Sequence, residues 1–200
     1  MKSFFKDHSY DMVKMFLNQF AISLFGFSLA LATSSAENVT LRNITGVGAV
    51  LFYLFLIYTM TWDIGYRDRV GVQSGRKKYV PLKGALISLC ANSVNFLLAI
   101  FIMLASVLDV PVLSTLGGIA HTGTVILEGM YTGLLMNYVG GVVLNSYWFV
   151  YFLLPIPAIL VSGMAYLFGV KDVKFTSVFN QQEYPESDRE PKRKKDRRDD

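Results

Sequence analysis

A histidine and a glutamate in the segment from Val112 to Tyr138 are the first candidates for acid–base chemistry. His121, Thr124 and Glu128 follow offsets of 3 and 7, which places them on one face if the segment is helical. Two helical turns separate the imidazole from the carboxyl, so a direct proton transfer would require a bend. One His with one Glu also provides too few ligands for a zinc site. We therefore expect the water-facing side of an amphipathic surface helix.

A second polar set lies inside a long apolar block. Ser88, Asn92 and Asn95 follow the i, i+4, i+7 spacing and share one helical face. Two amides in a membrane span avoid lipid, and we expect them to hydrogen-bond to a neighbouring helix, with each contact contributing about 0.6 kcal/mol. The alternative is a polar lining for a solute path.

A third set combines two acids with two arginines at the start of a polar stretch, which we interpret as a cytoplasmic loop from Asp63 to Lys83. The set consists of Asp63, Arg67, Asp68 and Arg69. These side chains can form a salt-bridged turn. The same cluster could bind a lipid phosphate or a carboxylate of a partner.

No familiar cofactor or metal motif accompanies these residues. Cys90 is the single cysteine, so a cysteine-based metal cluster and an intramolecular disulfide are both excluded. The chain has no Gly-rich phosphate loop and no Ser-His-Asp spacing. We expect no cofactor, no metal and no nucleic-acid partner.

The composition indicates what positions these side chains. Hydrophobic residues make up 52% of the 200 residues and charged residues 17%, against about 25% charged in soluble domains. The apolar residues form blocks close to the roughly 20 residues that span a bilayer. We therefore predict an all-α, polytopic integral membrane protein with a four-helix bundle in residues 15–168. The expected spans are residues 15–33, 45–62, 84–108 and 142–168.

The distribution of basic residues predicts the orientation. Of the 19 Lys and Arg residues, all except Arg42 lie in the N-terminal segment, in the loop after the second span or in the C-terminal tail. With four spans these three regions share one side, and the positive-inside rule makes that side cytoplasmic. Both termini are then cytoplasmic, and in a bacterium the membrane is the plasma membrane.

Residues 109–141 could supply a fifth crossing, which would move the tail outside and abolish the charge bias. Its part from Val112 to Tyr138 also contains His121, Glu128 and five glycines, which weaken a lipid-facing helix. We interpret it as an extracytoplasmic segment, amphipathic or re-entrant, that lies on the membrane or dips into it. A full crossing is the alternative.

The two ends of the chain and the first and last spans allow further predictions. Residues 1–14 combine aromatic and basic side chains and are expected to rest at the cytoplasmic interface. The first span is longer than the apolar core of a signal peptide, so we expect it to be retained. Pro155 and Pro157 are expected to kink or loosen the last span. Residues 169–200 are expected to form a charged cytoplasmic tail, disordered in its polar part.

Three functions are compatible with these features. The first is a structural or accessory subunit of a membrane assembly, without catalytic chemistry. The second is a channel or transporter component with a polar path near Asn92 and Asn95. The third is a lipid-acting membrane enzyme that uses His121 with Glu128, or Asp63 with Asp68. The expected partners are the bilayer, anionic lipid headgroups, other membrane subunits or a second copy of the chain. Close packing with such a partner could use Gly129 and Gly133.

Overall fold

The computed structural model describes residues 2–36, 38–108 and 110–173, and most of these residues are helical. The predicted all-α class is confirmed, with the addition of one small β-hairpin. Among the described residues, three helices are long and apolar enough to cross a membrane, and a bent pair adds a fourth if it counts as one span. These helices indicate a membrane-embedded protein. The expected disorder of the tail falls, from Lys174 onward, outside the described residues.

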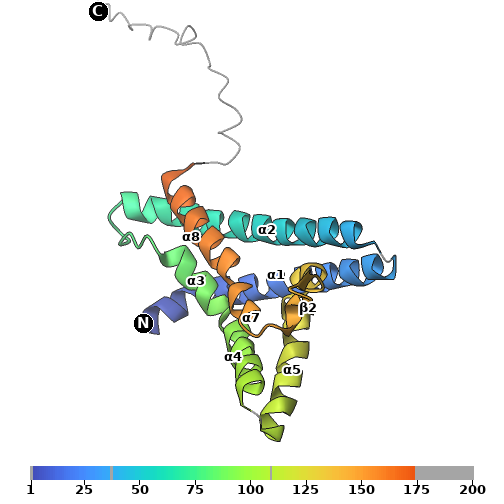
Figure 1. The fold of residues 1–200 in the computed structure, drawn as a ribbon. Helices are drawn as coiled ribbons and strands as arrows, with labels where there is room; N and C mark the ends of the chain where they lie inside the picture. Colours follow the sequence, from blue (N-terminus) through green and yellow to red (C-terminus); the bar gives the residue numbers. More distant parts are fainter. Residues whose placement is uncertain (1, 37, 109, 174–200) are drawn as a thin grey trace, which may run out of the picture.

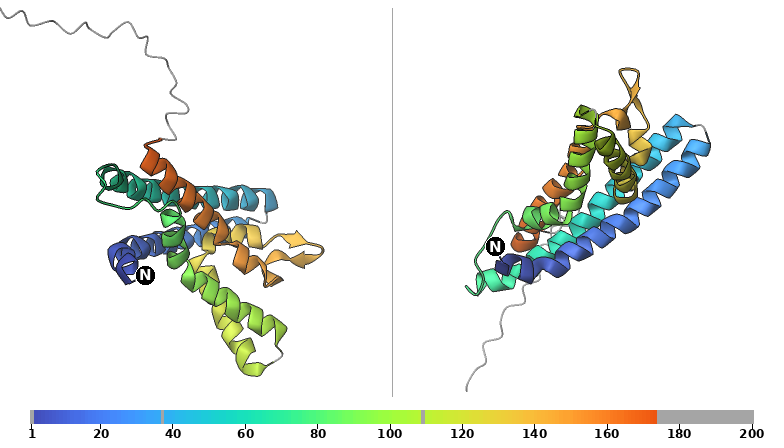
Figure 2. Two further views of the ribbon diagram at one scale, coloured as in Figure 1. Left: turned by 90° about the vertical axis from the view of Figure 1, so that its left-hand side faces the viewer. Right: turned by 90° about the horizontal axis from the view of Figure 1, so that it is seen from below.

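The frame of the molecule is a pair of long antiparallel helices, α1 (Lys2–Ser35) and α2 (Val39–Gln73), which lie side by side (Figures 1 and 2). Asn38 begins α2, since its side chain accepts a hydrogen bond from the backbone N–H of Leu41 at 2.9 Å. With 34 and 35 residues, each helix is about 50 Å long, compared with about 30 Å for the hydrocarbon core of a bilayer.

Both helices extend beyond the spans expected at residues 15–33 and 45–62. Residues 2–14 continue α1, and their interfacial location stays a prediction. The prediction of a loop from Asp63 to Lys83 is wrong in its first half, because α2 ends only at Gln73. Gly75, with a φ of +69°, follows directly after the C-cap residue Ser74. Hydropathy marks where a helix leaves lipid, whereas polar residues such as Arg and Lys sustain helical hydrogen bonding past that point.

The block expected as one straight span, residues 84–108, is two helices with an angle of 53° between them. Helix α3 (Lys83–Ala91) ends and α4 (Ser93–Val107) begins at Asn92. The side-chain amide of Asn92 donates to the carbonyl of Ser88 at 2.9 Å. Asparagine disfavours a helix interior because its side chain bonds to nearby backbone groups, and this is the physical reason for the bend.

The segment expected as a loop, residues 109–141, begins with a helix. Helix α5 (Pro111–Leu127) returns antiparallel to α4, and the two project together from the α1–α2 pair (Figure 1). Gly117 permits the close approach, because a Cβ there would lie 2.2 Å from the Cβ of Ala105. The amphipathic interpretation required a helix here, and the location of α5 relative to a bilayer stays a prediction.

The chain then makes several short elements before its last helix. These are η1 (Gly129–Tyr131), α6 (Thr132–Leu135), β1 (Tyr138–Val139), β2 (Val142–Val143) and η2 (Leu144–Ser146). The strands pair in an antiparallel manner, with Tyr138 opposite Val143. Gly140 and Gly141 form the turn with φ of +61° and +82°, which favours glycine at both positions.

The last span begins at Val150 rather than at residue 142, because residues 142–149 form β2, η2 and a short connection. This span is divided into α7 (Val150–Leu153) and α8 (Ile156–Lys171) by a break at Pro155, in agreement with the expected loosening of the last span. Helix α8 crosses α2 closely, since a Cβ at Gly65 would lie 2.3 Å from the carbonyl oxygen of Tyr166. Small residues therefore set this crossing.

Candidate functional site

The polar side predicted for α5 does not face water. Glu128 is only 2% exposed, and Thr124 is buried with its hydroxyl donating to the carbonyl of Ala120 at 3.0 Å. His121 is partly exposed, and its ring contacts the ring of Tyr151 edge-on at a centroid distance of 5.6 Å. The expectation of a water-facing side is therefore wrong, because α5 packs on α4 and α1 instead of lying alone on a surface.

Helix α1 contacts the end of α5 through two polar side chains. The hydroxyl of Ser23 donates to the carbonyl of Ile126 at 2.6 Å and accepts a hydrogen bond from the N–H of Gly129. The amide of Gln19 donates to the carbonyl of Leu127 at 3.2 Å. The last carbonyls of a helix lack intrahelical partners, and here α1 supplies them. The turn that carries Glu128 is thereby held against the middle of α1.

Glycines permit this contact. A Cβ at Gly129 would lie 2.4 Å from the carbonyl oxygen of Ser23, and a Cβ at Gly26 would lie 2.4 Å from the Cα of Met130. Gly133 lies against the first turns of α2, where a Cβ would be 3.2 Å from the carbonyl oxygen of Arg42. Gly129 and Gly133, considered above for packing with a partner, therefore pack within the chain.

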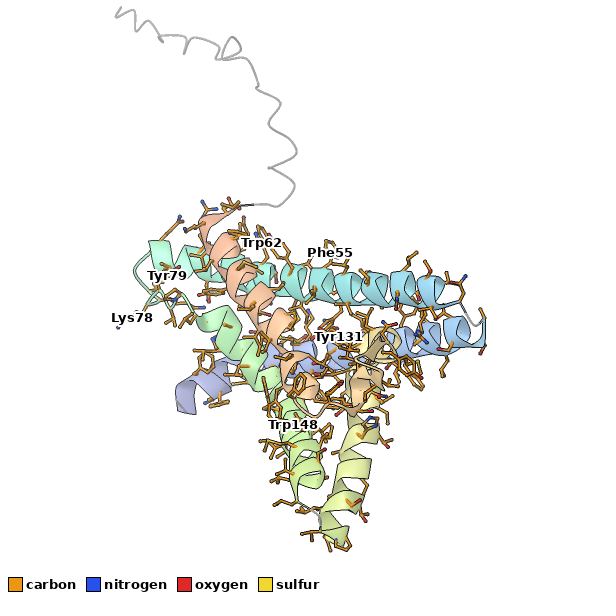
Figure 3. The ribbon with its side chains drawn as sticks, viewed as in Figure 1. Phe55, Trp62, Lys78, Tyr79, Tyr131 and Trp148 are labelled. Atoms are coloured by element: carbon orange, nitrogen blue, oxygen red, sulfur yellow. The ribbon has the colours of Figure 1, made fainter. Side chains whose placement is uncertain are left out.

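Three buried tyrosines belong to the same packed core as the turn that follows Glu128. They are Tyr53 of α2, Tyr131 of η1 and Tyr151 of α7. We call these four residues the tyrosine–glutamate centre. Tyr131 lies beside the α1–α2 pair (Figure 3).

The centre contains polar atoms without hydrogen-bond partners. Among the described residues, Oε2 of Glu128 and the hydroxyls of Tyr53 and Tyr131 form no hydrogen bond. Burial of a carboxyl favours its neutral form over its charged form. Glu128 is therefore the group of this centre that could exchange a proton.

The centre lies about halfway along the long helices. Ser23 is near the middle of the apolar stretch His8–Ser35, and Tyr53 is near the middle of α2. Polar groups at this position are far from both ends of the α1–α2 pair. In a helix pair that spans a bilayer, an ionisable side chain at this position is costly and marks a candidate functional site.

An open pocket of about 350 Å³ lies beside the centre, between α4, α5 and η2. We call it the serine pocket, and its polar lining consists of Ser106, Ser114, His121, Asn145 and Ser146. The hydroxyl of Tyr151 donates to the carbonyl of Asn145 at 2.7 Å. Tyr151 therefore contacts His121 and Asn145 of the pocket.

The structure brings Ser88, Asn92 and Asn95 together, but as partners of one another. Asn92 donates to Ser88, and the amide of Asn95 donates to Oδ1 of Asn92 at 3.0 Å. All three are buried, and Oδ1 of Asn95 has no hydrogen-bond partner among the described residues. Within the described residues, these amides form no hydrogen bond to a neighbouring helix of the kind expected above. The side-chain amides of Asn92 and Asn95 donate instead to Ser88 and Asn92, at the bend between α3 and α4.

The four charged residues predicted as one turn lie instead on the last turns of α2 and face different partners. Arg67 pairs with Asp63 at 3.2 Å and with Asp11 of α1 at 3.4 Å, and Arg69 pairs with Asp172. Successive residues on a helix are about 100° apart, so neighbouring charges point to different sides. A single salt-bridged turn does not form.

Asp68 is the buried member of this set, with 4% exposure. Its carboxylate accepts from Lys77 at 2.7 Å, from Lys83 at 2.5 Å and from the hydroxyl of Tyr166 at 3.2 Å. We call the part of the molecule where α1 begins, α2 ends, α3 begins and α8 ends the basic end. Four helices are joined there by ion pairs and by Tyr166.

Sequence reasoning missed the tyrosines of the centre and the partners of Asp68. A weak signal existed in Gln19 and Ser23, which are polar residues four apart inside the first span. Their partners lie more than 100 residues away in the chain, and no local pattern relates them.

Among the described residues, no group of three or more His, Cys, Asp or Glu side chains is placed to hold a metal ion.

Searches against protein-family models, curated protein sequences and solved structures gave no match for this chain.

Proposed function

We propose that this chain is a subunit of a membrane transport assembly in which Glu128 carries a proton on the transport path. The observation that supports this most is the position of its carboxyl, buried halfway along the α1–α2 pair with one oxygen lacking a hydrogen-bond partner among the described residues. A protonatable group at such a depth is costly to retain in a purely structural protein. The substrate class is a proton, alone or coupled to a small polar solute.

Two further features support a path. The serine pocket reaches His121 and Asn145, and both residues contact Tyr151 of the tyrosine–glutamate centre. The bend at Asn92 is a discontinuity within a membrane-long apolar stretch, and transporters use such broken helices to form polar sites. Four helices can barely enclose a path alone, so we expect the transport unit to be an oligomer or to include other subunits.

The test is proton flux in proteoliposomes that contain the purified full chain and an internal pH-sensitive dye. We expect flux for the wild type and none for Glu128→Gln, which keeps the size of the side chain but cannot ionise. The matched control is Asp63→Asn, which removes an exposed carboxyl at the basic end. Absence of wild-type flux both in proteoliposomes and in native membranes overturns the transport proposal.

An accessory subunit without its own path is the second candidate. Its support is the projecting α4–α5 pair, which exposes apolar side chains that could contact lipid or another subunit. The exposed residues on this pair include Leu97, Ile100, Leu116 and Ile119. If the wild type shows no flux and Glu128→Gln leaves the unfolding temperature unchanged, this candidate replaces the first.

The lipid-acting enzyme receives less support. His121 lines the serine pocket whereas Glu128 is buried against α1, and Asp63 and Asp68 have separate ion-pair partners. Acid–base catalysis requires two such groups to reach one substrate.

A further inference from the structure

We propose that a pocket at the basic end binds the phosphate group of an anionic phospholipid. The pocket has a volume of about 780 Å³ and lies where the connection between α2 and α3 meets the first turns of α1. We call it the lysine pocket. Its lining consists of Lys77, Lys78, Lys83, His8 and the apolar residues Phe4, Val80 and Leu86. The proposal is independent of the role of Glu128.

The charge of the lysine pocket suits a phosphate. Three ammonium groups line it, and among the described residues the one carboxylate bound to them is that of Asp68, which leaves these groups with a net charge of about +2. Asp68 contacts one ammonium with each oxygen, and each ammonium has three N–H donors. Lys77 and Lys83 are therefore held in place and retain donors for a second anion.

The apolar part of the lining favours a lipid over a soluble phosphate. Phe4, Val80 and Leu86 lie beside the ammonium groups, and Leu86 belongs to α3, which continues into the apolar region. Figure 3 shows Lys78 and Tyr79 on the connection that leads into α3. A headgroup can lie among the lysines while its acyl chains follow the apolar side chains, as basic and aromatic residues allow at a membrane interface.

The arginines nearby are less suited to this role. Arg67 is paired with two carboxylates and Arg69 with one, and neither lines the lysine pocket. Lys78 has no ion-pair partner among the described residues. The basic end is also the side that the charge bias predicts to be cytoplasmic, where anionic lipids create a negative surface potential.

The experiment uses the full chain in nanodiscs of phosphatidylcholine with a minor fraction of phosphatidic acid. Native mass spectrometry after release from the disc counts the lipids that stay bound. We expect the wild type to retain phosphatidic acid in preference to phosphatidylcholine. Removal of one lysine charge near a membrane weakens binding about fivefold, and we expect this loss for Lys78→Gln. Lys78→Arg keeps the charge and is expected to retain the lipid.

Lys171→Gln is the matched control, because it removes an exposed lysine at the end of α8 that does not line the pocket. An unfolding temperature equal to that of the wild type verifies the fold of each variant. Equal retention of the two lipids by the wild type, or equal losses for Lys78→Gln and Lys171→Gln, overturns the proposal.

A second arm separates the two sources of a phosphate group. Inorganic phosphate is added to the lipid-bound protein in detergent, at the same ionic strength as a chloride control. Persistence of the bound phosphatidic acid supports the lipid assignment. Displacement at millimolar phosphate, but not by chloride, overturns that assignment in favour of a site for free phosphate.

Discussion

The hydroxyl of Ser23 accepts a hydrogen bond from the backbone N–H of Gly129 while it donates to the carbonyl of Ile126, 2.6 Å away. One side chain in the middle of α1 thus closes the end of α5 and fixes the start of η1. Glu128 lies between the two bonded positions, so this contact sets the depth of the carboxyl along α1. The first two predictions follow from it.

Gly129→Ala is expected to prevent this packing. The added Cβ would lie 2.4 Å from the carbonyl oxygen of Ser23, which is backbone and cannot rotate away. We expect a loss of about 1 to 3 kcal/mol, typical of overpacking, and a lower yield of folded protein. Gly48→Ala is the control, since nothing lies within 4 Å of a Cβ there. The two variants are compared by thermal unfolding in detergent, and equal unfolding temperatures would contradict the prediction.

Glu128 is expected to make stability depend on pH. Its carboxyl is buried in the folded chain and solvated in the unfolded chain, and burial favours the protonated form, so the unfolded state loses its proton at a lower pH than the folded state. Stability therefore falls as pH rises above the value at which a solvated glutamate ionises.

The measurement is the unfolding temperature from about pH 5 to pH 8. Glu128→Gln is expected to remove most of the slope, whereas Asp63→Asn, which changes an exposed carboxyl, leaves it in place. A wild-type slope that persists in Glu128→Gln would show that other groups cause it.

Asp68→Asn is expected to destabilise the basic end. The change leaves the ammonium of Lys83, 12% exposed, without its carboxylate, and the one amide oxygen that remains cannot replace both carboxylate oxygens, which accept from Lys77 on one side and from Lys83 and Tyr166 on the other. Loss of one partner of a buried pair costs about 3 kcal/mol or more. Asp63→Asn breaks an exposed pair and is expected to cost less than about 1 kcal/mol. Chemical denaturation of both variants checks the difference, and similar losses would refute the assignment of Asp68 as the buried partner.

Asn92→Leu is expected to straighten the α3–α4 pair, because leucine favours a helix interior and cannot bond to the carbonyl of Ser88. Spin labels at Leu86 and Ile100, both exposed, report the bend in a Cys90→Ala background. The inter-label distance is expected to lengthen relative to the same labels without the leucine substitution. An unchanged distance would mean that tertiary contacts alone maintain the bend.

Labelling of single cysteines with an impermeant reagent on intact cells tests the predicted orientation. In a Cys90→Ala background, cysteines at Ser35 and Thr122 are expected to react, and those at Ser74 and Ser177 are not. Ser177 belongs to the tail, outside the described residues. Reaction at Ser177 as well would contradict the four-span orientation and would mean that residues 112–138 cross the membrane.

The regions that the sequence predicted well are those controlled by local composition. The apolar blocks at residues 15–33 and 45–62 lie within α1 and α2, and the last block contains most of α8. Hydrophobic length is a property of consecutive residues, so it can be read without a structure. The helix ends were less accurate, since helical hydrogen bonding continues into polar residues such as those after Trp62.

The candidate site could be predicted only in part. The sequence singled out Glu128, but it assigned the carboxyl to a water-facing side. Its burial depends on Ser23 and Gln19 of α1 and on Tyr53 of α2, which come from distant parts of the chain. Similarly, Asp68 was assigned to a cluster with its neighbours in sequence, whereas two of its contacts come from Lys83 and Tyr166.

The sequence by itself determined the helical class, the apolar stretches and the gathering of basic residues near a few chain positions, because each depends on nearest neighbours along the chain. Only the tertiary structure decided that α5 turns back onto α1, that Glu128 is buried among tyrosines and that the lysines form a pocket around Asp68. The physical reason is that burial and electrostatic environment depend on which distant segments pack together. That choice rests on close contacts at positions such as Gly129 and Gly65, whose significance appears only once the helices are assembled.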